Sequence, residues 1–179
     1  AVVLGLADDA VVDIVSSLQI PKEVSCANFN CPGQVVISGT AKGVEVAKTA
    51  LLAKGAKRVL GLEVHGAFHS QLMASAEKEL ALAIEGTLFS ESAIPIAMNV
   101  TGKTTTNISE IKKLLVKQLT SSVRWSSCVN AMDSMLPTHF LEIGCGTTLQ
   151  GMNKRIGPKA ATISIEKTKD IESLVGLYA

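Results

Sequence analysis

The sequence lacks several features that would place the protein in a specialised class. Its 179 residues contain no apolar run of about 18 residues, so no segment is predicted to span a membrane. Aromatic residues make up only 3% of the chain, and the lysines and arginines are scattered around a net charge of +1. A nucleic-acid-binding surface would need basic residues in a stripe or interleaved with aromatic ones, so no nucleic-acid partner is indicated.

Cysteine is present but carries no site signature. The four cysteines lack the Cys-x-x-Cys spacing of zinc and redox motifs, and in a chain without a secretion signal they are predicted to be reduced thiols. The first six residues are apolar but follow no charged segment, so they are not a signal peptide. The chain also lacks an initiator methionine, and we expect it to be part of a longer or processed protein.

A hydrophobic content of 47% is sufficient for a buried core, and its periodicity predicts an α/β protein. Through residue 64 the predicted order is β-α-β-β-α-β, which is the ferredoxin-like arrangement. Asp8 or Asp9 is predicted to cap the first helix, and Gly55 to end the second. The predicted strands are 1–6, 24–28, 34–38 and 58–64, and the two helix faces hold Val11, Ile14, Val15 and Leu18, then Val44, Ala47 and Leu51.

The second half alternates helices with single apolar strands, which predicts a parallel sheet. A helix beginning at His69 or Ser70 should place Met73, Ala76, Leu80 and Ile84 inward. Asn107 and Glu110 resemble a capping box for a helix with Ile108, Ile111, Leu115 and Leu119 inward. Further helices are predicted at 125–135 and 148–156, and strands at 94–100, 139–143 and 161–165.

His69 is the leading candidate for chemistry. It follows an apolar run and Gly66, at a predicted junction between a strand and a helix. A neutral imidazole at such a junction can accept a proton from a hydroxyl or thiol and return it to a leaving group. A structural loop histidine fits the same pattern, so both interpretations stay open at this point. His65 and His69 are four residues apart, but Gly66 argues against the helix that a metal pair would need, so no metal site is predicted.

No nucleophile or acidic partner for this histidine stands out. The available hydroxyls are Ser38, Ser70, Ser121 and Ser122, and none lies in the Gly-x-Ser-x-Gly elbow that exposes a catalytic serine. Cys31 and Cys145 stand beside turns and could be nucleophiles, and the alternative interpretation is that they are small structural residues of a loop or core. Residues 144–146, Gly-Cys-Gly, form either an anion-binding turn or a plain turn with positive φ.

Two amides complete the candidate residues. Asn28 and Asn30 precede a Pro-Gly turn, where they either bind a polar ligand or stabilise the turn. His139, before an apolar strand, is predicted to be structural.

Four segments, in order along the chain, resemble motifs of the malonyl-CoA:acyl carrier protein transacylases. Residues 27–39 resemble the family's N-x-N-x-P-G-Q-V-V-I-S-G segment, and residues 66–73 resemble its catalytic-histidine segment. Residues 118–125 resemble Q-L-x-x-P-V-R-W, and residues 142–156 resemble E-x-G-P-G-x-x-L-x-G-x-x-K-R-I. Each motif is short, but the four together are specific to the family.

The resemblance implies two domains: a ferredoxin-like small domain at residues 1–65, then the C-terminal part of an α/β-hydrolase-like acyltransferase domain at residues 66–179. It implies a ping-pong reaction in which a serine attacks the thioester of malonyl-CoA, and His69 takes the serine's proton. The phosphopantetheine thiol of acyl carrier protein then accepts the malonyl group. Both are substrates, and no bound cofactor or metal is implied.

The same resemblance assigns roles to further residues. The backbone carbonyl of Gln118 would orient His69, which would explain the missing acidic partner. Phe68 would crowd an α-methyl group and so select malonyl, and Asn28 and Asn30 would contact the substrate.

The family's serine, its carboxylate-binding arginine and its oxyanion loop would all lie before Ala1. The chain alone is therefore expected to be inactive and to need the N-terminal part of the same enzyme as a partner. The implied location is the cytoplasm of a bacterium, or a plastid or mitochondrion of a eukaryote. Ser122 and Cys145 replace prolines of the family motifs, so the local turn geometry is expected to differ at these two positions.

Three interpretations remain open from the sequence. The chain is an acyltransferase fragment of fatty-acid synthesis, a fragment of a polyketide or multifunctional synthase, or a non-catalytic binding module on a ferredoxin-like fold.

Overall fold

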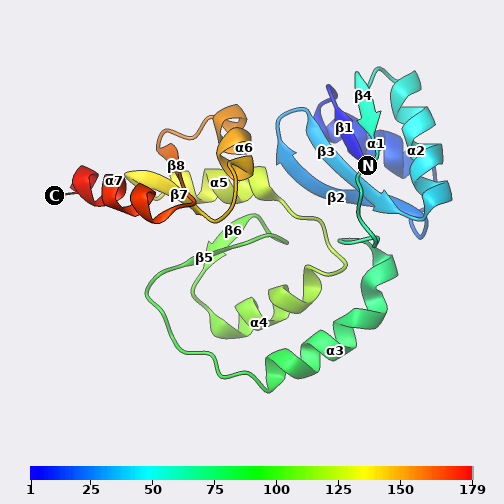
Figure 1. Cartoon of the computed structure of the whole chain (residues 1–179). Coiled ribbons are helices and arrows are strands. Elements are labelled where there is room, and N and C mark those ends of the chain that lie inside the picture. The colour runs from blue at the N-terminus through cyan, green and yellow to red at the C-terminus, as the bar shows by residue number, and fades with distance from the viewer. Residues whose placement is uncertain (179) are drawn as a thin grey trace.

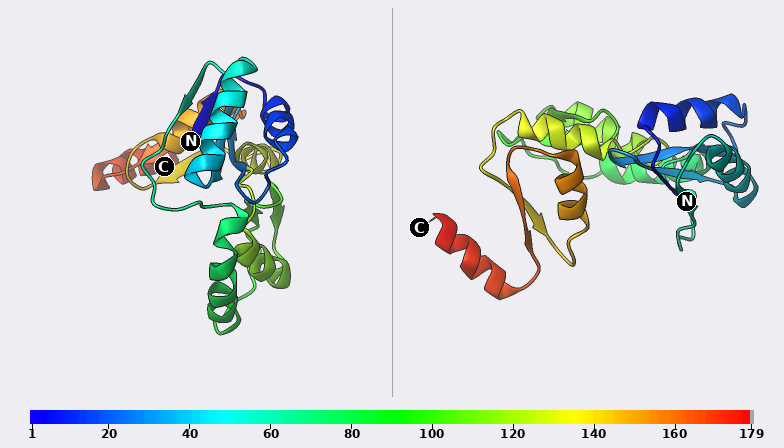
Figure 2. Two further views of the ribbon diagram at one scale, coloured as in Figure 1. Left: turned by 90° about the vertical axis from the view of Figure 1, so that its right-hand side faces the viewer. Right: turned by 90° about the horizontal axis from the view of Figure 1, so that it is seen from above.

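A computed structural model gives the α/β architecture of the chain. It describes the backbone of residues 1–178 and their side chains apart from residues 173, 177 and 178. Three separate sheets are present among the described residues, of four, two and two strands. The N-terminal unit and the C-terminal helix lie at opposite ends of an elongated molecule (Figures 1 and 2). None of the described helices is long and apolar enough to cross a membrane.

The first unit has the predicted β-α-β-β-α-β order. Its strands pair antiparallel in the spatial order β2-β3-β1-β4. The two helices lie beside this sheet in Figure 1. The elements are β1 (Val2–Leu4), α1 (Asp8–Ser17), β2 (Val24–Cys31), β3 (Gln34–Gly39), α2 (Ala41–Ala53) and β4 (Arg58–Leu60).

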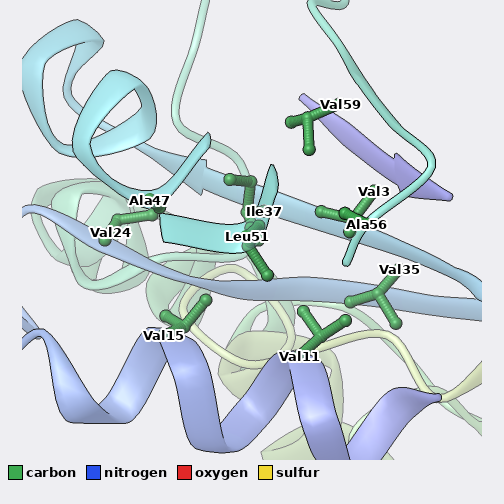
Figure 3. Packing of buried hydrophobic residues seen from close by; sticks show 10 residues of the cluster. All are labelled: Val3, Val11, Val15, Val24, Val35, Ile37, Ala47, Leu51, Ala56 and Val59. Carbon is green, nitrogen blue, oxygen red and sulfur yellow. The ribbon is translucent and has the colours of Figure 1, made fainter. Parts of the chain in front are cut away.

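The core of this unit lies between the helices and one face of the sheet (Figure 3). Val3 pairs with Val35 on one side and Val59 on the other, so the three side chains share a face. Helices α1 and α2 cover that face with apolar residues at helical spacing. The ten buried members are Val3, Val11, Val15, Val24, Val35, Ile37, Ala47, Leu51, Ala56 and Val59.

Only one of the two helices in this unit, α2, begins at a side-chain cap. Thr40 caps α2 as a side-chain acceptor for Gly43 N–H at 3.0 Å, and Gly55 adopts φ +99° after it. The prediction that an aspartate caps α1 is wrong, because the N-cap is Ala7, without a side-chain hydrogen bond. Asp8 Oδ1 is instead buried with no hydrogen-bond partner among the described residues. Burial, and then the neighbouring Asp9, raise the pKa of Asp8.

The middle of the chain does not form the parallel sheet that the sequence predicts. The strand expected at 94–100 is short and pairs antiparallel with a strand that the sequence did not predict. The capping box is present, since Asn107 Oδ1 accepts from Glu110 N–H at 2.9 Å. The elements are a 3₁₀ turn (Gln71–Met73), α3 (Ala74–Glu85), β5 (Ile96–Met98), β6 (Lys103–Thr105) and α4 (Ile108–Lys117).

The C-terminal region contains the only parallel pairing between strands that the described residues form. Strands β7 (His139–Ile143) and β8 (Ala161–Ile165) pair in parallel and flank α6 (Thr148–Ile156), as predicted. Helix α5 (Trp125–Asp133) precedes them, and α7 (Thr168–Tyr178), which was not predicted, follows. A two-stranded parallel sheet has two open edges, and Ile143 and Leu141 of β7 are exposed.

We expect the first unit's core to respond strongly to loss of volume. Leu51→Ala should lower the free energy of unfolding by about 2–5 kcal/mol, because the side chain is fully buried between α2 and the sheet. Leu52→Ala, on the exposed side of the same helix, is the matched control and should cost about 0.5 kcal/mol or less. Urea unfolding followed by circular dichroism measures both. Equal costs for the two variants would contradict this placement of the core.

Candidate active site

His69 lies on a tight loop rather than directly after a strand. Strand β4 ends at Leu60, and an irregular segment leads to the 3₁₀ turn that begins at Gln71. His69 itself has φ +60°, a left-handed conformation that few residues other than glycine adopt. The neighbouring Ser70 holds the loop in place: its hydroxyl donates to the Ala67 carbonyl at 2.6 Å and accepts from Leu72 N–H at 3.3 Å.

These contacts decide the role of Ser70. Its side chain is only 4% exposed, and its hydroxyl is used within the loop. Ser70 therefore shapes the loop that presents His69, and it is not a free nucleophile.

The His69 imidazole has one defined partner. Its Nδ1 lies 2.8 Å from the backbone carbonyl oxygen of Gln118. A carbonyl only accepts hydrogen bonds, so Nδ1 carries the proton and donates it. In the neutral ring Nε2 is then the atom with a free lone pair.

The Gln118 carbonyl belongs to the end of α4. Gln118 is the C-cap residue of that helix, where the last carbonyls have no partner within the helix. The imidazole therefore meets the negative end of the helix dipole, which favours a positive charge on the ring.

The segment that follows, residues 118–124, joins the candidate site to the first unit. Val123 N–H donates to the Ala27 carbonyl and Phe29 N–H donates to the Val123 carbonyl, each at 2.8 Å. The Ser122 hydroxyl donates to the Cys26 carbonyl at 2.7 Å. Ser122, which stands where the resembled motif has a proline, thus ties this turn to β2 with a hydrogen bond.

His69 lines two neighbouring cavities. The larger, about 650 Å³, also contains Phe68, Asn28, Val36 and Ser38 in its wall. Asn28 and Val36 are register partners on β2 and β3. The smaller, about 310 Å³, lies between His69 and the segment 118–124.

Three predicted residues therefore meet in one cavity: His69, Phe68 and Asn28. Phe68 is 50% exposed, and a Cβ on Gly66 would lie 3.1 Å from two of its ring carbons, so the ring rests against this glycine. Asn30 lies further along β2 and lines neither of the two cavities. Ser38 lines the larger cavity, but among the described residues no hydrogen bond joins it to His69.

The cysteines predicted as possible nucleophiles do not meet the histidine. Cys31 is fully buried in β2, and its thiol donates to Gln34 Oε1 at 3.6 Å. Burial raises the pKa of Cys31, which keeps it as an unreactive thiol. Cys145 is exposed in the turn between β7 and α6 and lines neither cavity of His69.

The Gly-Cys-Gly turn does not leave a free anion site. Gly144 and Gly146 both have positive φ, as a plain turn requires. The Glu142 carboxylate already accepts from Leu149 and Gln150 N–H, each at 2.8 Å, at the start of α6. Burial acts to raise the pKa of Glu142, but these donors and the Ser164 hydroxyl outweigh it and lower that pKa.

The other histidines stand apart from the site. His65 is exposed and His139 begins β7. In the described part of the chain, no group of three or more histidine, cysteine, aspartate or glutamate side chains is placed to hold a metal ion.

Sequence reasoning missed the residues that hold the Gln118 segment. The Asn99 side-chain amide donates to Gln118 Oε1 at 3.2 Å, and Gln71 Nε2 donates to the Thr120 carbonyl at 3.3 Å. Thr120 and Glu77 share a further hydrogen bond. These partners are 19 to 49 residues apart along the chain, and no local spacing marks them.

Comparison with known proteins gives one consistent result. No family model matches the chain. It is 37% identical over 173 residues to a malonyl CoA-acyl carrier protein transacylase of Bacillus subtilis, covering 96% of this chain and 55% of that protein. It is 38% identical over 156 residues to the protein of the same name from Escherichia coli K12, covering 87% of this chain and 50% of that protein.

Solved structures that are similar to this chain are also malonyl transferases. A malonyl transacylase in complex with a type II polyketide synthase acyl carrier protein has a TM-score of 0.92 and 34% identity, over 98% of this chain and 57% of that one. An acyl carrier protein S-malonyltransferase of Vibrio cholerae has a TM-score of 0.91 and 34% identity, over 97% and 56%. The chain thus spans about half the length of the relatives it matches.

The thiol of Cys26, in the smaller cavity's wall, allows a chemical test of the site's burial. Burial, and then the charge of Asp8, raise the pKa of Cys26 from 9.0 to about 11. The reactive thiolate should then be about a hundredfold scarcer at pH 8 than for a free thiol of pKa 9.0. We expect iodoacetamide to label Cys26 slower than a free thiol by about that factor, and the rate to rise about tenfold per pH unit until pH approaches 11.

Peptide mass spectrometry measures this labelling, with the exposed Cys145 of the same chain as the internal control. If Cys26 and Cys145 react at the same rate at pH 8, the described burial of Cys26 is wrong.

Proposed function

We propose that this chain, which is homologous over nearly its whole length to malonyl CoA-acyl carrier protein transacylases, carries the general base of a malonyl transfer reaction. The observation that carries the proposal is the hydrogen bond of 2.8 Å from His69 Nδ1 to the Gln118 carbonyl. It fixes the ring and the tautomer, so Nε2 is ready to accept a proton beside a cavity of about 650 Å³.

The reaction has two half-steps. His69 Nε2 takes the proton of a serine hydroxyl as the serine oxygen attacks the thioester carbonyl of malonyl-CoA. The tetrahedral intermediate then expels the coenzyme A thiolate, which receives the proton, and a malonyl-serine ester remains. In the second half-step the phosphopantetheine thiol of acyl carrier protein gives its proton to His69 and attacks the ester, and the serine oxygen leaves with that proton. None of these steps requires a resident cofactor.

The end of α4 supports this role of His69. When the ring takes a proton it becomes positive, and both the Gln118 carbonyl and the helix dipole stabilise that charge. A backbone carbonyl thus does the orienting that a carboxylate does in a Ser-His-Asp triad.

The remaining site residues have roles that follow from their place around the cavity. Asn28, from the sheet face opposite the helices, is suited to hold a polar part of the substrate. Phe68, next to His69, is suited to narrow the space beside the α-carbon of the acyl group. Asn30 remains a proposed substrate contact, although it lines neither cavity of His69.

We assign residues 1–65 as a ferredoxin-like domain and residues 66–179 as part of an α/β-hydrolase-like domain. The strand order β2-β3-β1-β4 supports the first assignment. The parallel pair β7-β8 supports the second assignment. Parallel sheets are normally covered on both faces, whereas this pair has an open edge and exposed apolar residues, as expected of part of a larger sheet. We propose that the segment carrying the serine completes this sheet, within the same enzyme.

We further propose that acyl carrier protein and malonyl-CoA are the partners, in bacterial fatty-acid synthesis. The relatives from Bacillus subtilis and Escherichia coli support this choice, and a bacterial enzyme of this pathway works in the cytoplasm. A polyketide synthase is the second candidate, because one matching structure is a complex with a polyketide carrier protein.

Replacement of His69 tests the proposal. In the enzyme completed by its serine-bearing segment, His69→Ala should lower malonyl transfer by about two to four orders of magnitude, the usual contribution of a general base. His65→Ala, at an exposed histidine four residues away, is the matched control and should leave the rate unchanged. The rate of malonyl transfer to acyl carrier protein measures both. A loss under about tenfold in His69→Ala would favour a non-catalytic binding module instead.

Replacement of Phe68 tests the acyl-group filter. Phe68→Ala opens space beside His69, so the ratio of kcat/KM for methylmalonyl-CoA to that for malonyl-CoA should rise by about tenfold or more, the effect of relieving one crowded methyl group. Phe89→Ala, at an aromatic residue that packs under α4, is the control and should leave the ratio unchanged. An unchanged ratio in Phe68→Ala would remove the filter role.

A further inference from the structure

The Gln118 carbonyl is held by contacts that the catalytic role of His69 alone does not explain. Thr120, two residues after Gln118, is 6% exposed and makes hydrogen bonds through both its side chain and its backbone. Its hydroxyl donates to the carboxylate of Glu77 on α3. Its carbonyl accepts from Gln71 Nε2 at 3.3 Å.

These contacts link two short segments on both sides of the catalytic hydrogen bond. Gln71 follows His69 by two residues, as Thr120 follows Gln118 by two. Glu77 adds a second link, because it also lies 3.7 Å from Lys117 Nζ, just before Gln118. The ion pair with Lys117 is half exposed and contributes little by itself, so the hydroxyl of Thr120 is the stronger partner.

The loop of His69 has a conformational reason to need such support. A residue other than glycine at φ +60° costs about 1–2 kcal/mol relative to the right-handed conformation. Such a conformation persists only where surrounding contacts hold it. The backbone on the other side, at the end of α4, is also a helix terminus, where hydrogen bonding within the helix stops.

We propose that Glu77 and Thr120 are positioning residues that keep the Gln118 carbonyl in line with His69 Nδ1. This inference rests on the proposed function of His69 as general base. Without the Thr120–Glu77 hydrogen bond, the segment after α4 loses its buried side-chain link to α3, and Gln71 and His69 itself remain as its hydrogen-bonded contacts with the histidine loop. The carbonyl then moves relative to Nδ1, and the tautomer with a free Nε2 is no longer enforced.

The test uses the enzyme completed by its serine-bearing segment and two pairs of variants. Thr120→Val removes the hydroxyl and keeps the volume, and Thr120→Ser restores the hydroxyl. Glu77→Ala removes the acceptor, and Glu77→Gln keeps an amide oxygen that still accepts from Thr120. We expect Thr120→Val and Glu77→Ala to lower kcat by about tenfold with KM for malonyl-CoA within about twofold, because misplacement affects chemistry more than binding. The conservative partner of each pair should keep kcat within about twofold of the parent enzyme.

A second measurement separates positioning from general stability. The ¹⁵N chemical shifts of the His69 ring report which nitrogen carries the proton. We expect the Nδ1–H tautomer to dominate in the parent enzyme, Thr120→Ser and Glu77→Gln, and to lose its dominance in Thr120→Val and Glu77→Ala. Thr49→Val, which removes an exposed hydroxyl that bonds to a backbone carbonyl on α2, is the control for loss of a threonine hydroxyl elsewhere.

The outcomes distinguish this inference from the proposed function. An unchanged kcat in Thr120→Val and Glu77→Ala, while His69→Ala is inactive, overturns only the positioning role. A lower kcat with an unchanged His69 tautomer also overturns it, since the residues then act through stability alone. Full activity in His69→Ala instead overturns the proposed function, on which this inference rests. If Thr120→Val does not fold, the Glu77 pair, on a partly exposed helix surface, decides the question by itself.

Discussion

The structure depends on the backbone of residues 118–124, which forms hydrogen bonds with His69, with β2 and with Asn99. The Gln118 carbonyl accepts a hydrogen bond from His69. Val123 bonds to β2 through both its N–H and its carbonyl, and Arg124 N–H donates to the Asn99 carbonyl at 2.9 Å. Without this segment, the first unit and the α3–α4 region would share few connections other than the chain itself. The segment that orients the imidazole through Gln118 therefore also joins two parts of the fold through Ser122, Val123 and Arg124, so the geometry at His69 and the assembly of the fold are coupled.

This coupling explains why a backbone carbonyl can orient the histidine that we propose as general base. A carboxylate on a flexible side chain must be held by further contacts, whereas a carbonyl moves only with its backbone. Here that backbone is fixed by a helix before it and by pairing with β2 after it. The same arrangement accommodates a serine where the resembled motif has a proline, because the Ser122 hydroxyl donates a hydrogen bond to the Cys26 carbonyl and holds the turn by another means.

Much of the fold could be predicted from the sequence, because its signals are local. The first unit is specified by the valines of β1 and β3 and by apolar residues at helical spacing, Val11 and Val15 on α1 and Leu51 on α2. Asn107 marks the start of α4. Strand β6 was missed because Lys103–Thr105 is polar and pairs only with β5. The prediction of an aspartate cap was wrong because Ala7 occupies the N-cap position, while Asp8 lies within the helix with its Oδ1 atom buried and without a hydrogen-bond partner.

The candidate site could be predicted only where a residue carries its own chemistry. His69 has a side chain that suits proton transfer, and the resemblance to a family supplied Gln118, Phe68 and Asn28. Thr120 has no such signal: its importance arises from Glu77, 43 residues away, and from the exact shape of a loop. The orientation of His69 does not depend on such long-range identification of a nucleophile, because its ring has a defined partner within the described residues. The hydrogen bond from Nδ1 to the Gln118 carbonyl sets the ring and its tautomer, and Gln71 and Glu77 hold Thr120 two residues further along the same segment.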